Sequence, residues 1–388
     1  MSKLDWFKNA IVYQILIDRF AGFKSIKNWD KPIFLGGNIK GIINKITYIH
    51  NLGVNTIWIS PFYKTTEYHG YHVTDFYKVE PRFGTIDDIK NLIDIVHKYN
   101  MKIIADFVPN HCSIENPFFK KAINDRNSMY KNWFYFKKWP KEYLCFLNVK
   151  ELPKINLENP NTANYIINAA KHWLSLGFDG FRLDHVIGPK HKFWKNFRNE
   201  IKSIFPNRIL IGEAWMMGIK FSELRTININ HKILNWLRFF SPDNLLRDYI
   251  GELDGVLDFR VQELIKKFIC NKSYKEDIFI KKINNHYKKF PKNYYLPAFL
   301  DNHDMDRFLF NCNNDLHKLL KGFKILINLK QPVIIYYGTE TGLTQPKSLW
   351  QFSQYGDLMA RKPMDWENLN QKNINLIKQI ITERENYS

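Results

Sequence analysis

The amino-acid sequence predicts an α/β fold in which eight strand–helix units close into a (β/α)8 TIM barrel. Short apolar segments rich in β-branched residues alternate with amphipathic segments, which is typical of a parallel sheet covered by helices. The strand–helix unit recurs eight times, the number that closes such a barrel. Charged and polar residues also gather directly after several of these strands, at the rim where such barrels carry their chemistry.

The predicted strands are short and apolar, as expected for strands buried on both faces. Pro61 follows the second strand and is expected to end it. The eight strands are predicted at 10–17, 55–60, 102–108, 178–184, 208–212, 255–259, 296–301 and 333–337.

The predicted helices repeat apolar residues every three to four positions, and local signals mark their ends. Gly53 is expected to end the first helix, and Thr85 to cap the second, with Asp87 and Asp88 in its first turn. The helices are predicted at 39–52, 86–99, 163–175, 191–205, 315–329 and 370–384.

One long segment interrupts the alternation of strands and helices. Residues 111–158 are dense in aromatic residues and show no clear period, so we expect a small subdomain inserted after the third strand. The domain organisation is then a first barrel part at 1–110, the insert at 111–158 and a second barrel part at 159–388. The stretch 216–252 gives no clear pattern.

Composition excludes several classes of function. The net charge is +19, but lysine outnumbers arginine and the basic residues are scattered along helices, so we expect no nucleic-acid partner. The first 19 residues lack the features of a signal peptide, and no apolar run approaches the ~20 residues that a membrane helix needs. The cysteines are too far apart for a zinc motif and are expected to be free thiols; they are Cys112, Cys145, Cys270 and Cys312. We expect a cytoplasmic protein without a membrane partner.

The stretch 177–185 carries the first chemical signal. Side chains alternate along a strand, so Arg182 and Asp184 point the same way while Phe181 and Leu183 point the other. A neighbouring guanidinium keeps a carboxylate ionised, which makes Asp184 a candidate nucleophile. The alternative for this triplet alone is a buried structural ion pair.

Similar groups follow other predicted strands. Each alone is explained by a helix cap or a solvated loop residue, but carboxylates brought together at one rim are costly unless function requires them. They are Tyr71 and His72 after the second strand, Asp106, Asn110 and His111 at the third, Glu213 and Trp215 at the fifth, and Asp301, His303 and Asp304 at the seventh.

Clustered carboxylates indicate glycoside chemistry, in which one carboxylate attacks or activates water and a second carboxyl protonates the leaving oxygen. We assign Asp184 as the nucleophile. Glu213 is the predicted acid/base, because apolar surroundings and like charges raise a carboxyl pKa. Asp304 is then the third carboxylate, which stabilises charge that develops on the sugar ring.

The chain resembles the α-amylase superfamily, glycoside hydrolase family 13, over nearly its whole length. The resemblance is carried by motifs in family order: Asp106-Phe-Val-Pro-Asn-His111, Gly180-Phe-Arg-Leu-Asp184, Gly212-Glu-Ala-Trp215 and Phe299-Leu-Asp-Asn-His-Asp304. It implies a retaining double displacement on α-glucans with the same three carboxylates.

The resemblance also implies roles for the residues around these carboxylates. His111 and His303 would hydrogen-bond the sugar at the cleavage point, Arg182 would fix the nucleophile, and Tyr71 would stack on the ring. Asp106 resembles the structural aspartate of the family. His72 departs from the acidic residue or Trp that many members carry after the stacking Tyr.

The segment Leu152-Pro-Lys-Ile-Asn156 is similar to a signature of the neopullulanase and cyclomaltodextrinase branch. The N-terminal domain of that branch and the C-terminal β-domain usual in the family are expected to be absent, which would leave barrel surface for a homo-oligomer to cover. Calcium is common in the family, and Asn110 matches one ligand position. Because Ile187-Gly188 replaces the usual Lys-His and no calcium loop is found, we expect no cofactor and no required metal.

The resulting hypothesis is a retaining hydrolase of α-1,4-glucosidic bonds in maltodextrins and starch-type α-glucans. One alternative is a transglycosylase like the 4-α-glucanotransferases, which shares the covalent intermediate. Others are a cyclomaltodextrinase or neopullulanase and, more remotely, a non-catalytic carbohydrate-binding subunit. Chain-length preference, α-1,6 tolerance and endo or exo action depend on loop shape, which sequence patterns leave open.

Overall fold

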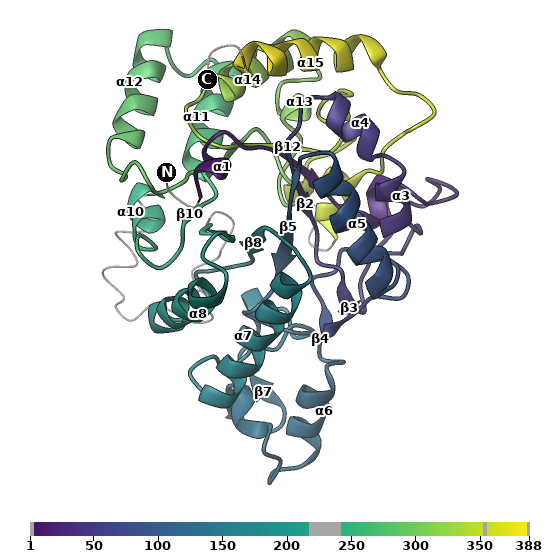
Figure 1. The fold of residues 1–388 in the computed structure, drawn as a ribbon, viewed down its shortest axis with the longest axis vertical. Coiled ribbons are helices and arrows are strands. Elements are labelled where there is room, and N and C mark those ends of the chain that lie inside the picture. The colour runs from purple at the N-terminus through teal and green to yellow at the C-terminus, as the bar shows by residue number, and fades with distance from the viewer. Residues whose placement is uncertain (1–3, 217–241, 352–354, 386–388) are drawn as a thin grey trace. The chain divides into compact units, whose positions relative to one another are not determined.

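A computed structural model of the chain describes residues 4–216, 242–351 and 355–385 (Figure 1). The chain divides into two compact units. Unit 1 comprises Met1–Ser60, Arg82–Ile103 and Leu257–Ser388, and unit 2 comprises Pro61–Pro81 and Ile104–Val256. The predicted insert lies within unit 2, and its exact boundaries stay a prediction. Residues 217–241, within the stretch that gave no sequence pattern, lie outside the described residues.

Unit 1 contains four neighbouring parallel strands in the order β2-β1-β12-β11. Val12 of the central strand β1 pairs with Thr56 on one side and Ile334 on the other. All residues of these strands are buried, as expected for a parallel sheet covered on both faces. The strands are β1 (Ile11–Ile15), β2 (Thr56–Ile59), β11 (Ala298–Phe299) and β12 (Val333–Tyr336).

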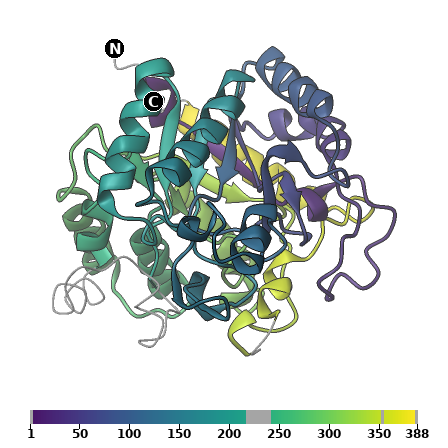
Figure 2. The ribbon, with the colours of Figure 1, turned by 90° about the horizontal axis from the view of Figure 1, so that it is seen from below.

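The helices of unit 1 confirm most of the predicted positions. Thr85 caps α5 with a capping box that it forms with Asp88, and Gly53 has a φ of +87° after the end of α4. The predicted helix 39–52 is instead two helices broken around Asn44, a residue type that is unfavourable inside helices. Figures 1 and 2 show α3 beside α5. The helices are α1 (Asp5–Lys8), α2 (Ile17–Phe20), α3 (Ile39–Ile43), α4 (Ile46–Asn51), α5 (Ile86–Lys98), α11 (Phe259–Ile269), α12 (Glu276–Tyr287), α13 (Phe308–Asn311), α14 (Leu316–Ile327) and α15 (Gln371–Glu385), with 3-10 turns η4 (Leu349–Gln351) and η5 (Gly356–Arg361).

Unit 2 contains the strand order β5-β8-β9-β10, again parallel throughout. The register is central to the site, because Asp106 pairs with Arg182, and Arg182 pairs with Ile211. The strands are β5 (Lys102–Phe107), which enters unit 2 at Ile104, β8 (Gly180–Leu183), β9 (Ile209–Gly212) and β10 (Gly255–Val256).

Helices and short strands complete unit 2. The helix predicted at 163–175 begins earlier, at Pro160, because the Asn159 side chain caps it and proline suits the first helical position. The hairpin β3 (Tyr63–Thr65) and β4 (Val73–Val79) was not predicted. Figure 1 shows α6 and β7 of the insert at the lower end of this unit. The remaining elements are α6 (Pro117–Asn124), η1 (Lys131–Trp133), β6 (Phe136–Lys138), β7 (Glu142–Tyr143), η2 (Phe146–Asn148), α7 (Pro160–Ser175), α8 (His191–Ile204) and α10 (Pro242–Arg247).

All eight predicted strands are present, four in each unit, which confirms the (β/α)8 fold class. Among the described residues, no helix is both long enough and apolar enough to cross a membrane. The prediction that all cysteines are free is wrong for one pair. Cys270 and Cys312 form a disulfide, because the ends of α11 and α13 bring their Cα atoms within 4.6 Å, a proximity that 42 residues of separation conceal in the sequence.

Candidate active site

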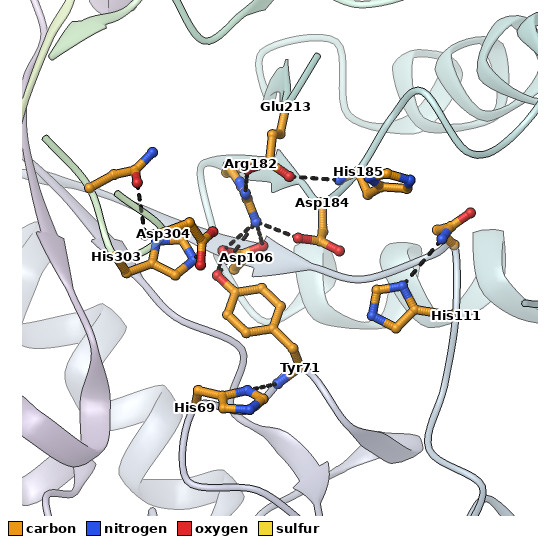
Figure 3. A network of polar contacts seen from close by, with 12 residues as sticks. His69, Tyr71, Asp106, His111, Arg182, Asp184, His185, Glu213, His303 and Asp304 are labelled. Carbon is orange, nitrogen blue, oxygen red and sulfur yellow. Dashed lines mark hydrogen bonds and ion pairs between the residues drawn. The ribbon is translucent and has the colours of Figure 1, made fainter. Parts of the chain in front are cut away.

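The Arg182 guanidinium contacts three carboxylates in the interior of unit 2 (Figure 3). Its Nη1 donates to Asp106 Oδ1 and Oδ2 at 2.8 and 2.9 Å and to Asp184 Oδ1 at 2.8 Å. Its Nη2 lies 2.5 Å from Glu213 Oε1. Strand register explains this arrangement, because Asp106 and Arg182 are partners on adjacent strands and Glu213 directly follows β9. Three sequence-predicted site residues, Arg182, Asp184 and Glu213, are therefore brought together.

The electrostatics of this cluster favour a charged guanidinium. Burial alone would lower the pKa of Arg182, but the carboxylates of Asp106 and Glu213, together with Tyr71 and Asp184, outweigh burial and raise it well above its usual value. The arginine therefore stays cationic. One guanidinium thus faces three carboxyl groups in the interior of unit 2.

Backbone geometry fixes the two candidate catalytic carboxyls. The amide of Asp184 donates to Phe107 O and the amide of Glu213 donates to Leu183 O, so the sheet ladder continues up to both residues. The next amide, from His185, donates to Glu213 Oε2 at 3.1 Å. His185 adopts a left-handed φ of +45°, which is uncommon for a residue other than glycine and is typical of constrained functional loops.

Tyr71 and His111 border the same cluster. The Tyr71 hydroxyl donates to Asp106 Oδ2 at 2.7 Å, and its ring centroid lies 5.9 Å from the Arg182 guanidinium carbon. Burial lowers the pKa of His111 well below its usual value, assisted by His185 and His72, so the ring is neutral. Its Nδ1 accepts from the Asn110 amide at 3.2 Å, while its buried Nε2 makes no hydrogen bond to the described residues. That nitrogen is available to donate to a ligand.

The other two predicted site residues, His303 and Asp304, lie in unit 1 (Figure 3). Asp304 Oδ2 lies 3.0 Å from His303 Nε2, and Asp304 Oδ1 accepts from Arg361 Nη2 at 2.7 Å. The Nδ1 of His303 lies 2.7 Å from the Gln14 amide nitrogen, which fixes Nε2 as the protonated nitrogen. The Asp304 side chain is 30% exposed, so it can face a ligand.

The position that matches a calcium ligand in the family does not fit that ion. Asn110 Oδ1 is buried without a hydrogen bond to the described residues. Near it, however, the Lys154 ammonium donates to Gly188 O at 2.8 Å, and a cation would be repelled there. Calcium prefers six to eight oxygen ligands. Within the described part of the chain, no group of three or more His, Cys, Asp or Glu side chains could hold a metal ion.

Four residues that contact individual sequence-predicted residues were not predicted as functional; they are His185, Arg361, Lys154 and Phe146. The sequence offered one usable signal, since His185 directly follows the candidate nucleophile. Arg361 lies 57 residues beyond Asp304, and Lys154 and Phe146 lie in the aperiodic insert, so no local pattern connects them to the site.

A (β/α)8 barrel with an arginine-centred carboxylate cluster at its strand ends is the arrangement of a glycoside hydrolase. Residues 14–224 and 240–387 match the family model described as "Alpha amylase, catalytic domain". The chain therefore belongs to the alpha-amylase family.

Two relatives and one solved structure illustrate the match. The chain is 36% identical to "Alpha-amylase 2" of Dictyoglomus thermophilum over 98% of this chain and 64% of that protein. It is 28% identical to "Intracellular maltogenic amylase" of Bacillus subtilis, over 98% and 62%. The ligand complex of the Arthrobacter globiformis cyclic alpha-maltosyl-(1→6)-maltose hydrolase superposes with a TM-score of 0.85 at 24% identity, covering 100% of this chain and 84% of that one. This last match confirms the fold.

The branch suggested by residues 152–156 is represented among the relatives, which include proteins named cyclomaltodextrinase and neopullulanase 2. The chain spans 60 to 64% of the length of these curated relatives.

Proposed function

We propose that the protein is a retaining glycoside hydrolase that cleaves α-1,4-glucosidic bonds in maltodextrins and related α-glucans. The observation that carries the proposal is that Asp184 and Glu213, at the ends of adjacent strands, both contact the buried guanidinium of Arg182. A retaining mechanism needs two carboxyl groups on one glycosidic bond, with one ionised and one able to carry a proton. Family membership supports an α-glucan as the substrate.

In the first step, an Asp184 oxygen attacks the anomeric carbon. The bond to the leaving oxygen breaks, and that oxygen takes the proton of Glu213. In the second step, water attacks the anomeric carbon and gives a proton to Glu213, and the ester bond to Asp184 breaks. Arg182 favours the ionised form of the attacking carboxylate.

Glu213 has to alternate between protonated and ionised forms. Both of its oxygens face donors, Arg182 Nη2 and the His185 amide, which favours the ionised form that activates water. Because the first step needs the protonated form, one of these contacts has to loosen when substrate binds.

The remaining residues bind or stabilise the sugar in this proposal. Asp304 stabilises the positive charge that develops on the ring, and its contact with Arg361 fixes its orientation. His111 donates from Nε2 to a sugar hydroxyl, His303 contributes a second contact, and Tyr71 offers its ring for stacking.

Product analysis on maltotriose, starch, pullulan and a cyclodextrin tests the proposal. Hydrolysis predicts products shorter than the substrate, whereas oligomers longer than maltotriose indicate transfer. Asp184→Asn and Glu213→Gln should each lower kcat by roughly 1000-fold or more. Glu200→Gln, an exposed carboxylate paired with Lys171, is the matched control. Full activity of the Asp184→Asn protein would overturn the assignment.

Three further proposals accompany this function. The enzyme requires no metal, which the Lys154 ammonium near Asn110 supports; unchanged activity after EDTA treatment is the expected result. It acts in the cytoplasm, which the intracellular relative supports. Self-association, for which light scattering is the test, stays a prediction.

A further inference from the structure

Phe146 occupies a closed turn of the insert next to the site. Its amide donates to Leu152 O at 2.9 Å, and its own carbonyl accepts from Val149 at 2.8 Å. The two residues that follow it, Leu147 and Asn148, have left-handed φ values of 45° and 64°. The strain of two such residues indicates that the surrounding structure dictates the conformation of this turn.

The segment after the turn connects it to the site. Pro153 forms a bridge with Cys145, and Lys154 forms a bridge with His111. The backbone that carries Phe146 is therefore tied to the segment that follows β5.

The Phe146 ring contacts two imidazoles. Its centroid lies 4.5 Å from that of His111, with 34° between the planes, and 4.6 Å from that of His185, with 82° between the planes. His185 follows Asp184 directly and binds Glu213 through its amide. His111 contributes the buried Nε2 that lacks a hydrogen bond to the described residues. One ring of the insert thus contacts a side chain on each of the two loops that follow β5 and β8.

We propose that Phe146 is a positioning residue that orients the imidazoles of His111 and His185 beside the nucleophile Asp184. This inference rests on the proposed glycosidase function. The ring reduces the rotamer freedom of both imidazoles, so that His111 Nε2 is aimed at the sugar before binding and the loop after Asp184 keeps its left-handed conformation. Pre-organisation of this kind lowers the cost of reaching the transition state.

The exposure of Phe146 distinguishes it from the core of the insert. Phe119 and Phe134 pack against each other and are 1% and 5% exposed. Phe146 is only half-buried, and its two ring partners are site histidines rather than other apolar residues of the insert. Phe136 is also half-buried but stacks on Phe119, so it provides a matched control.

The test compares Phe146→Ala, Phe146→Tyr and Phe136→Ala in the full-length protein. Phe146→Ala should lower kcat/KM on maltotriose by about 10-fold or more, because the loss of each aromatic contact should lower kcat/KM severalfold. The Tyr variant keeps the ring and should return within about threefold of wild type. The Phe136→Ala control should lower the melting temperature as much as Phe146→Ala but leave kcat/KM unchanged.

A second readout does not depend on activity. In 15N spectra of labelled imidazoles, Phe146→Ala should change the side-chain signals of His111 and His185, and Phe136→Ala should not. Equal kinetics and equal imidazole signals in the two Ala variants would refute the positioning role. A wild-type protein that cleaves none of the glucans refutes the proposed function instead, and the imidazole signals then still decide whether Phe146 orients the two rings.

Discussion

Asp106 accepts two hydrogen bonds from a single nitrogen of Arg182, at 2.8 and 2.9 Å, and neither side chain is more than 1% exposed. The pair holds Arg182 in place for the site, because the same nitrogen also binds Asp184. Each partner neutralises the other, and either charge left unpaired in the interior would destabilise the fold.

Asp106→Asn should therefore lower both stability and activity. It removes one of the carboxylates that compensate the buried guanidinium, and breaking such a pair costs about 3 kcal/mol or more. Denaturant unfolding measures the stability and maltotriose hydrolysis the activity. Asp87→Asn, which removes an exposed pairing with Lys90, is the control and should cost under about 1 kcal/mol. Equal losses in the two variants would contradict this account.

Arg361→Ala should lower kcat more than it raises KM. Arg361 acts through Asp304, whose orientation it fixes at 2.7 Å, so its loss should weaken transition-state stabilisation by roughly 10- to 100-fold. Steady-state kinetics on maltotriose provide the measurement. The control is Arg208→Ala, which removes an arginine bound to Asp179 and should leave kcat unchanged. A variant that changes only KM would argue against this role.

His185 should contribute to acid unfolding. Burial, then the charges of Lys154 and Arg182, lower the pKa of His185 from 6.5 to about 3. The unfolded chain therefore binds this proton first as the pH falls. The contribution of the neutral His185 ring to the free energy of unfolding is fully present above pH 6.5. It is lost as the pH falls toward 3, by roughly 1.4 kcal/mol per pH unit.

His185→Asn removes this titration and keeps a residue that tolerates the left-handed conformation. Between pH 6.5 and 3, the free energy of unfolding should fall less steeply with decreasing pH in the variant than in the wild type. Urea unfolding across this range is the measurement. The control is His50→Asn, which replaces an exposed histidine and should leave the curve parallel to that of the wild type. Parallel curves for wild type and His185→Asn would contradict the assignment.

Reduction of the Cys270–Cys312 disulfide should destabilise the protein. The bond closes a loop of 42 residues, which corresponds to about 4 kcal/mol of chain entropy in the unfolded state. Cys270→Ser should unfold at the same denaturant concentration with or without dithiothreitol, whereas wild type should shift. Cys145→Ser, at a buried cysteine outside this disulfide, should keep the shift. Alkylation of all four cysteines in the untreated, unfolded protein would show that the bond does not form.

The eight sheet strands and most of the predicted helices could be located from the sequence, because each is encoded by residues that are neighbours along the chain. Apolar runs marked all eight strands, and Thr85 marked the start of α5, because burial and capping depend on neighbours along the chain. Strand alternation alone placed Arg182 and Asp184 on one face, and their hydrogen bond agrees. The prediction of one helix at 39–52 was wrong, because the apolar period continues through the break at Asn44 that separates α3 from α4.

Long-range partners were decided by tertiary structure. The Asp106–Arg182 pairing depends on strand register, Arg361 reaches Asp304 from 57 residues away, and Cys270 meets Cys312 only where two helix ends converge. Phe146 belongs to a segment without any period. The sequence by itself thus determined the eight sheet strands, most of the predicted helix positions and the residue types at the strand ends, but not α11, α12 or the hairpin β3–β4. Which of those residues touch was determined by packing, because contacts between distant segments form only when their shared surfaces are buried together.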